Sequence, residues 1–235
     1  MLVAAAVCPA PPLLVPEVAA GAAAELGDAR TACSDALAVL AASRPDLLVV
    51  VGAAEEEQAG AYLQGARGTF RGFGVDTEVR LGEGEEGPRP LPASLAVGAW
   101  LLGHARWGAA PLEGLAIDAS LDTARCLEAG REIAEGDERI ALLVMGDGSA
   151  KRTLKAPGYL DERAAAFDAA VGRALAAADA AALAALDPAL AAELQAAGRA
   201  PWQVLAGAAQ GAGLDGRLLY EEAPYGVGYF VAVWS

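Results

Sequence analysis

The chain has 235 residues, which is enough for one large α/β domain and short for two. Its composition is 55% hydrophobic but only 6% aromatic, so its core must be built mainly from alanine, valine and leucine. The net charge of −14 disfavours the basic face that phosphate binding requires, so nucleic acid is not expected as a partner.

Cysteine usage and the N-terminus indicate a cellular compartment. The three cysteines, Cys8, Cys33 and Cys126, form no CxxC pair, and their odd number is typical of a reducing environment. The N-terminus is apolar from Leu2 onward and lacks the positively charged region of a secretory signal. Charged residues, glycines or prolines interrupt every apolar run that could otherwise span a bilayer. We therefore expect a cytoplasmic protein without a membrane partner.

The first third of the chain predicts a strand, a helix and a second strand. Residues 2–7 form a short apolar run that ends at Cys8-Pro9, as a fully buried strand does. A proline-rich turn follows, and Pro16-Glu17 opens a helix that is expected to run to about Ser43, with a break at Gly27. Residues 47–51 then predict another buried strand, which ends at Gly52.

The middle of the chain alternates between strands and helices. Residues 75–81 have the alternation of a half-exposed strand, and residues 82–90 predict a solvated loop. Helical spacing follows from Pro92 to about Arg106. Residues 112–117 predict a strand, and residues 122–134 predict a helix.

A third buried strand and two helices come next. Residues 139–145 read as a strand that ends at Gly146, and residues 153–158 read as a loop. A long amphipathic helix is expected from Asp161 to about Ala178. A second is expected over residues 180–197, with a new helical segment at Pro188.

The C-terminal part predicts one more helix and two strands. Pro201 is placed at the first position of a helix that runs to about Gln210. Residues 217–221 and 228–234 predict strands that add an antiparallel edge. The whole pattern predicts a single domain over residues 1–235 of the α/β class, with three α/β/α layers around a mostly parallel, mixed sheet.

The loops that follow the buried strands hold the candidate chemistry, because ligands of open α/β sheets bind at the carboxyl ends of the strands. If the strands are parallel neighbours, these loops meet at one edge. The candidate catalytic residues there are Cys8, Asp147, Ser149 and Lys151. Together with Arg152 they could perform acid–base chemistry or hold an anionic small molecule. The alternative is a solvated rim with a capping Asp and Ser, and a Cys8 that is simply buried.

Other residues carry weaker signals. The run Glu55-Glu56-Glu57 could supply a metal ligand, but a run of acids is usually a solvated face. His104, the single histidine, lies near the end of a predicted helix, where the helix dipole is enough to explain it. One histidine also excludes a two-histidine metal site.

The order of the segments resembles the class III extradiol dioxygenase superfamily, in the form of its catalytic subunits, together with its Memo-like relatives. The resemblance covers nearly the whole chain. It rests on the segments Cys8-Pro-Ala-Pro-Pro-Leu-Leu14, Leu48-Val-Val-Val-Gly-Ala-Ala-Glu55, Val144-Met-Gly-Asp-Gly-Ser-Ala150, Gly198-Arg-Ala-Pro201 and Tyr225-Gly-Val-Gly-Tyr229. It implies the fold of the extradiol dioxygenase catalytic subunits. In active members, two histidines and a carboxylate hold Fe(II) for ring cleavage of catechols with O₂.

Carried over residue by residue, the resemblance implies a degenerate metal site. The family's first histidine falls near Ala10 and its second near Glu55 or Glu56. The histidine that closes the glycine-rich segment falls at Ala150, and the remaining ligand falls close to Ala197. Alanine offers no lone pair to a metal, so no metal is expected, with Glu55 or Glu56 as a ligand at most. The resemblance places a substrate pocket at Pro9, Ala10, Pro11, Glu55, Glu56, Ala150, Arg152, Arg199 and Tyr225.

Three functional hypotheses follow. The first is an atypical member of the family that has lost its iron, needs no cofactor, and binds a small molecule in the strand-end cleft; Fe(II) is expected only if the family activity is retained. The second is an enzyme, either a divergent dioxygenase or another oxidoreductase or hydrolase, that uses Cys8, Asp147 and Lys151. The third is an interaction protein that forms a homo-oligomer.

Overall fold

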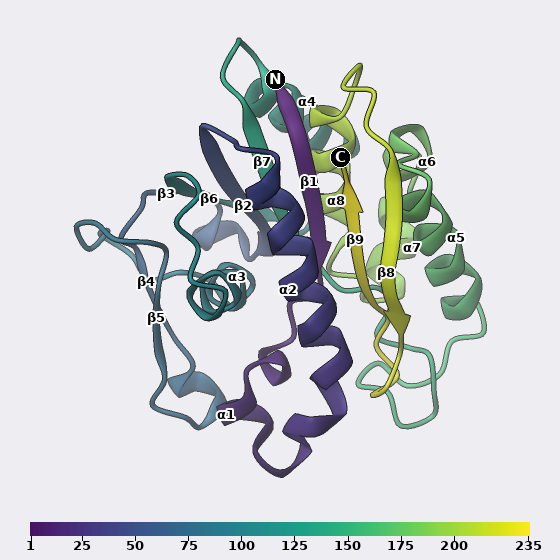
Figure 1. Cartoon of the computed structure of the whole chain (residues 1–235). Helices are drawn as coiled ribbons and strands as arrows, with labels where there is room; N and C mark the ends of the chain where they lie inside the picture. The colour runs from purple at the N-terminus through teal and green to yellow at the C-terminus, as the bar shows by residue number, and fades with distance from the viewer.

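A seven-stranded mixed sheet forms the centre of the computed structural model, which describes all 235 residues (Figure 1). The strand order is β3-β6-β2-β7-β1-β9-β8. The strands are β1 (Leu2–Cys8), β2 (Leu47–Ala54), β3 (Gly60–Tyr62), β6 (Leu112–Asp118), β7 (Ile140–Met145), β8 (Gly216–Glu222) and β9 (Tyr229–Trp234). The four central strands β6, β2, β7 and β1 run parallel, while β3, β9 and β8 are each antiparallel to the neighbour they pair with. The predicted α/β class, mostly parallel sheet and antiparallel edge are confirmed.

Helices cover both faces of the sheet and make three layers (Figure 1). One face carries α2 (Gly27–Ala42) and α3 (Ala93–His104). The other carries α4 (Thr123–Ala134), α5 (Ala164–Ala176), α6 (Ala180–Ala184), α7 (Pro188–Glu193) and α8 (Arg199–Ala208). Successive residues of a strand point to opposite faces, so Ala4 and Ala6 join one apolar core and Ala5 and Val7 the other. This two-sided burial explains why the central strands are continuous apolar runs.

Helices α4 and α8 pack unusually close together. A Cβ atom on Gly130 of α4 would overlap the carbonyl oxygen of Val204, and a Cβ on Gly207 of α8 would overlap that of Leu127. The two glycines therefore let the backbones of the helices touch. This contact fixes the position of α8, whose first residues reach the carboxyl edge of the parallel strands.

The structure differs from the sequence-based prediction mainly at helix boundaries. The expected helix over residues 16–43 consists of α1 (Pro16–Ala19), a 3₁₀ segment over Ala20–Leu26 and α2, which begins at the predicted break, Gly27. The helix expected over residues 180–197 divides at Pro188 as predicted, where the Asp187 carboxylate accepts a hydrogen bond from Ala189 N at 2.8 Å and caps α7, but α7 ends earlier than expected, at Glu193.

Three further predictions of local structure were wrong. Helix α5 begins at Ala164 instead of Asp161, whose carboxylate accepts hydrogen bonds from Arg163. Helix α8 begins at Arg199, so Pro201 is its third residue. The strand expected over residues 75–81 is limited to β5 (Glu78–Arg80), which pairs with β4 (Arg67–Thr69) outside the main sheet. Such short edge pairings carry little periodic signal.

None of the helices combines the length and the hydropathy needed to cross a bilayer.

Candidate functional site

The loops after β1 and β7 meet at the carboxyl edge of the sheet, as the parallel order predicts. The two strands end in register, with Cys8 opposite Met145. Gly146 N donates a hydrogen bond to Cys8 O at 3.0 Å, and Ala10 N donates one to Asp147 Oδ1 at 2.8 Å. The start of α8 joins them, because Gly198 N donates to Asp147 O at 2.7 Å. Three segments that are distant in sequence therefore converge on Asp147.

Asp147 is a carboxyl group in a water-poor environment. Burial raises its pKa to about 7, and the hydrogen bond from Ala10 N only partly opposes this effect. Tyr229 lies close by, and burial together with the Asp147 charge raises the pKa of its phenol well above the usual range. A carboxyl with a pKa near neutrality can both accept and release a proton at physiological pH.

The raised pKa predicts a pH dependence of stability that belongs to Asp147. Its pKa is about 7 when folded and about 4 when unfolded, so the folded state holds one more proton between these values. Its contribution to stability is therefore full below about pH 4 and falls by about 1.4 kcal/mol per pH unit as pH rises to about 7. We expect Asp147→Asn to remove this slope in chemical denaturation measured across that range. Equal slopes for the wild type and the variant would contradict the prediction.

Ser149 belongs to a buried network that fixes the loop after β7. Its N–H donates to Asp168 Oδ1 and its hydroxyl to Asp168 Oδ2, each at 2.8 Å. Arg152 forms an ion pair with the same carboxylate at 3.0 Å. Asp168 and Ser149 are both completely buried, and Gly148 and Gly228 leave the space that the carboxylate occupies. The hydroxyl of Ser149 and the guanidinium of Arg152 thus hold the loop together.

Asp168 did not figure among the residues expected at the site. It lies on α5 between Ala164 and Val171, at helical spacing with both, and these neighbours are buried. An acidic residue on the apolar face of a predicted amphipathic helix was the signal that could have identified it.

The other two candidate catalytic residues lie apart from Asp147. Cys8 is fully enclosed in the apolar core, where its thiol and burial raise the pKa of the Cys33 thiol well above its usual range. The Lys151 side chain lies along Gly158. The pKa of Asp161 is held at about 2, mainly by hydrogen bonds from Arg163, with a smaller contribution from the charge of Lys151. The structure therefore does not gather Cys8, Asp147 and Lys151 around one open space.

The positions expected to hold metal ligands offer no converging donor set. Ala10 and Ala150 are half-buried, and Ala150 N donates to Leu194 O at 2.9 Å. Pro9 and Pro11 are buried beside Ala10. Glu55 and Glu56 follow β2 but are exposed at the start of a 3₁₀ turn. No group of three His, Cys, Asp or Glu side chains is arranged to hold a metal ion.

Two further features lie at the carboxyl edge of the sheet: an enclosed tyrosine hydroxyl and a close contact between two glycines. The hydroxyl of Tyr225 is enclosed, and burial together with the Glu25 carboxylate raises the pKa of the phenol. A Cβ on Gly146 would clash with Gly198 Cα, and a Cβ on Gly198 would overlap the ring of Trp202. This glycine pair allows the hydrogen bond between Gly198 N and Asp147 O.

A groove of about 330 Å³ opens at the same edge, between the loop after β6, helix α7 and the start of α8. Its volume lies within the range of small-molecule sites, which begins at about 300 Å³. The lining residues are Ala119, Ser120, Pro188, Ala191, Ala192, Gln195, Ala196, Ala197 and Arg199. The sequence pointed to Ala197 and Arg199 but not to the contribution of α7.

The Arg199 side chain links the loop after β6 to the start of α8 by hydrogen bonds. Its side chain donates hydrogen bonds to the carbonyl oxygens of Ala119 at 2.6 Å and of Leu121, on the loop after β6. It also reaches Gln203 Oε1 at 3.2 Å, within α8. Only 4% of Arg199 is exposed, so one buried guanidinium positions both the loop and the helix start.

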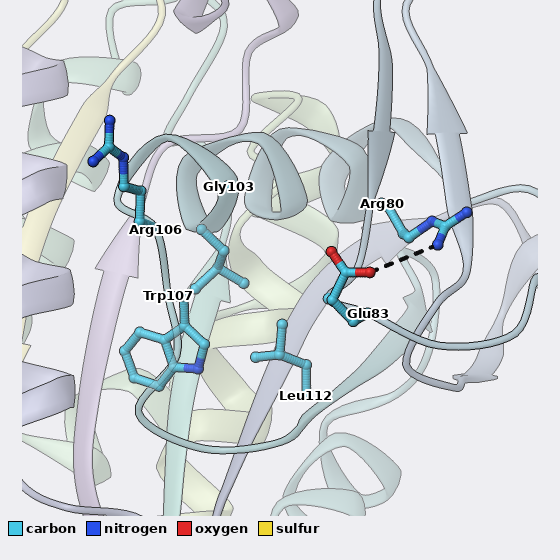
Figure 2. A pocket seen from close by; sticks show the side chains of 8 residues that line it. Arg80, Glu83, Gly103, Arg106, Trp107 and Leu112 are labelled. Atoms are coloured by element: carbon cyan, nitrogen blue, oxygen red, sulfur yellow. Dashed lines mark ion pairs between the residues drawn. The ribbon is translucent and has the colours of Figure 1, made fainter.

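A second cavity, of about 270 Å³, lies at the opposite edge of the sheet, near Leu112 at the start of β6 (Figure 2). Figure 2 shows Arg80 and Arg106 on different sides of this cavity, with their guanidinium groups pointing away from each other. Arg80 is 4.0 Å from the exposed carboxylate of Glu83. His104 ends α3 at this edge and stacks on Trp100, with ring centroids 5.1 Å apart. The single histidine is therefore remote from Asp147.

Comparison with known proteins supports the fold. No protein-family model matches the chain, and no curated protein sequence matches it. A similar solved structure is that of the uncharacterized protein JW3007 from Escherichia coli K12, with a TM-score of 0.54, 18% sequence identity, and coverage of 99% of both chains. At this identity, the likeness shows a shared fold over the whole length of the chain.

Proposed function

We propose that this chain is a small-molecule-binding protein that has the architecture of an extradiol dioxygenase catalytic subunit and does not use the iron chemistry of that family. The groove beside Arg199 carries the proposal. It lies at the carboxyl edge of parallel strands, where α/β proteins bind their ligands. Its volume is suited to a single-ring or short aliphatic molecule. The three free cysteines suit the cytoplasm as the place of action.

The residues at the strand ends do not fit an Fe(II) centre. Such a centre needs two imidazoles and a carboxylate that converge on one point. Here the equivalent positions hold Ala10 and Ala150, and the one carboxylate between their loops, Asp147, accepts a hydrogen bond from the backbone. The residues at this edge therefore support no reaction step through a metal.

Blocking the groove is expected to abolish ligand binding without unfolding the protein. Ala197 is exposed and lines the groove, so Ala197→Trp should fill it while the core stays intact. The measurement is saturation-transfer difference NMR with neutral single-ring probes, benzyl alcohol and benzamide. We expect saturation transfer from the wild type and none from Ala197→Trp.

Ala165→Trp is the matched control, because Ala165 is exposed on α5 and does not line the groove. It should bind the probes as the wild type does. Equal binding by the two tryptophan variants would place the probes elsewhere and contradict the proposal. Tight, stoichiometric uptake of Fe(II) under anaerobic conditions would contradict the loss of iron.

An acid–base enzyme is the second candidate, and the environment of Asp147 favours it. Its carboxyl has a pKa of about 7 and lies at the edge where three segments converge. Turnover of a small carbonyl or aromatic substrate would then follow the titration of Asp147. It would be lost in Asp147→Asn.

A further inference from the structure

The groove contains a buried positive charge that no protein anion neutralises. Arg199 is 4% exposed, and no carboxylate lies within ion-pair distance of its guanidinium. All its hydrogen-bond acceptors are neutral: two backbone carbonyls, the Gln203 amide oxygen and the Cys126 sulfur. An arginine stays charged at any physiological pH, so this guanidinium is hydrogen-bonded but has no countercharge paired with it in the protein.

The nearest acidic residues are already engaged. The Asp118 carboxylate accepts hydrogen bonds from the Ser120 backbone N–H at 2.8 Å and from the Ser120 hydroxyl at 2.9 Å. Asp122 caps α4 by accepting from Arg125 N at 3.0 Å. Both charges act on Cys126 together with Arg199, but neither pairs with the guanidinium. Asp118 and Asp122 therefore act on the positive charge of Arg199 only from a distance, without forming an ion pair with it.

One nitrogen of the Arg199 guanidinium forms no hydrogen bond within the protein. Its Nε donates to no protein atom. This nitrogen is not among the fully enclosed polar atoms without a partner, which are Trp202 Nε1 and the Tyr225 hydroxyl. The Nε–H of Arg199 is therefore an unused donor on a residue that lines the groove.

The walls of the groove suit an anion with an apolar body. None of the nine lining residues is acidic, although the chain carries 31 acidic residues and a net charge of −14. Six of the nine are alanine or proline. Besides Arg199, the polar lining residues are Ser120, in the loop between β6 and α4, and Gln195, in the loop between α7 and α8. A carboxylate could face Arg199 while its hydrocarbon part contacts the alanines.

We infer that the groove binds a compact monocarboxylate, with a branched aliphatic or single-ring body, and that Arg199 supplies the countercharge. This inference rests on the proposed function and narrows its ligand class. A charge-assisted hydrogen bond is about twice as strong as a neutral one, so the carboxylate should outcompete its neutral amide.

The test compares benzoate with benzamide, and cyclohexanecarboxylate with its amide, by titration calorimetry on the full chain. Each carboxylate is expected to bind about tenfold more tightly than its amide. Arg199→Gln should remove this preference, and Arg199→Lys should retain part of it. Arg217→Gln is the control, because Arg217 is exposed on β8 and forms no ion pair. Thermal unfolding of each variant shows whether the loop contacts of Arg199 survive.

Crystals grown with 4-bromobenzoate locate the ligand independently of any variant. An anomalous bromine peak in the groove, with the carboxylate on Arg199, would support the inference. Equal affinity for acid and amide, abolished by Ala197→Trp, would overturn the carboxylate preference and leave the proposed function standing. Binding of neither probe would overturn both. A bromine site away from the groove would overturn the assignment to Arg199.

Discussion

Asp168→Ala is expected to lower the free energy of unfolding by about 3–5 kcal/mol. The variant leaves the N–H and hydroxyl of Ser149 without acceptors in a completely buried position. It also leaves Arg152 without its anion. Each unsatisfied buried group costs about 1–3 kcal/mol, and the cavity adds to this loss. Denaturation in urea, followed by circular dichroism, measures the change.

Two further variants separate the parts of this network. Ser149→Ala removes one hydroxyl and leaves the backbone hydrogen bond and the ion pair, so it should cost only about 1 kcal/mol. Arg152→Gln should lie between the two, because the Arg152 side chain is 29% exposed and its charge is partly solvated. If Asp168→Ala costs no more than Ser149→Ala, the network does not hold the loop.

Gly207→Ala should destabilise the fold by about 3 kcal/mol although it adds only a methyl group. The new Cβ would overlap the carbonyl oxygen of Leu127 on α4. A backbone atom cannot relieve this clash by rotating into another rotamer, as a side chain can. Helices α4 and α8 would have to separate, which would also shift Arg199 and the groove. The expected result is a lower melting temperature together with weaker probe binding.

The matched control is Gly103→Ala, near the end of α3. Gly103 is exposed and no atom lies near its would-be Cβ, so alanine should be neutral or stabilise the protein by about 0.4–1 kcal/mol. Helix propensity favours alanine at both positions, so the difference in melting temperature between the two variants reports the effect of the contact between α4 and α8. Similar melting temperatures for both variants would show that α4 and α8 can move apart freely.

The sequence was sufficient for the six longer strands of the main sheet, whereas the three-residue edge strand β3 (Gly60–Tyr62) was not predicted. Strand β7 is apolar from Ile140 to Met145 and buried on both faces, and its short length and the following Gly146 identify it as a strand. The parallel direction of the central strands was predicted from the alternation of strands with helices. The meeting of the loops at Ala10 and Asp147 was predicted on the condition that their strands are parallel neighbours, and β1 and β7 meet this condition.

The groove could not be predicted in the same way. Its floor depends on where α7 sits, and alanine-rich helices present nearly the same residue on every face. The segmentation of residues 180–197 was predictable from Asp187-Pro188, but the packing of α7 against the loop after β6 was not. The role of Arg199 depends on backbone carbonyls of Ala119 and Leu121, which have no signature in a sequence.

The close approach of Gly146 and Gly198 limits how this edge of the molecule can evolve further. Because the indole of Trp202 occupies the space where a side chain at position 198 would begin, any donor residue introduced there needs a smaller residue at 202 beforehand. As long as Trp202 is present, a single substitution at position 198 therefore cannot place a metal-binding or proton-accepting side chain there.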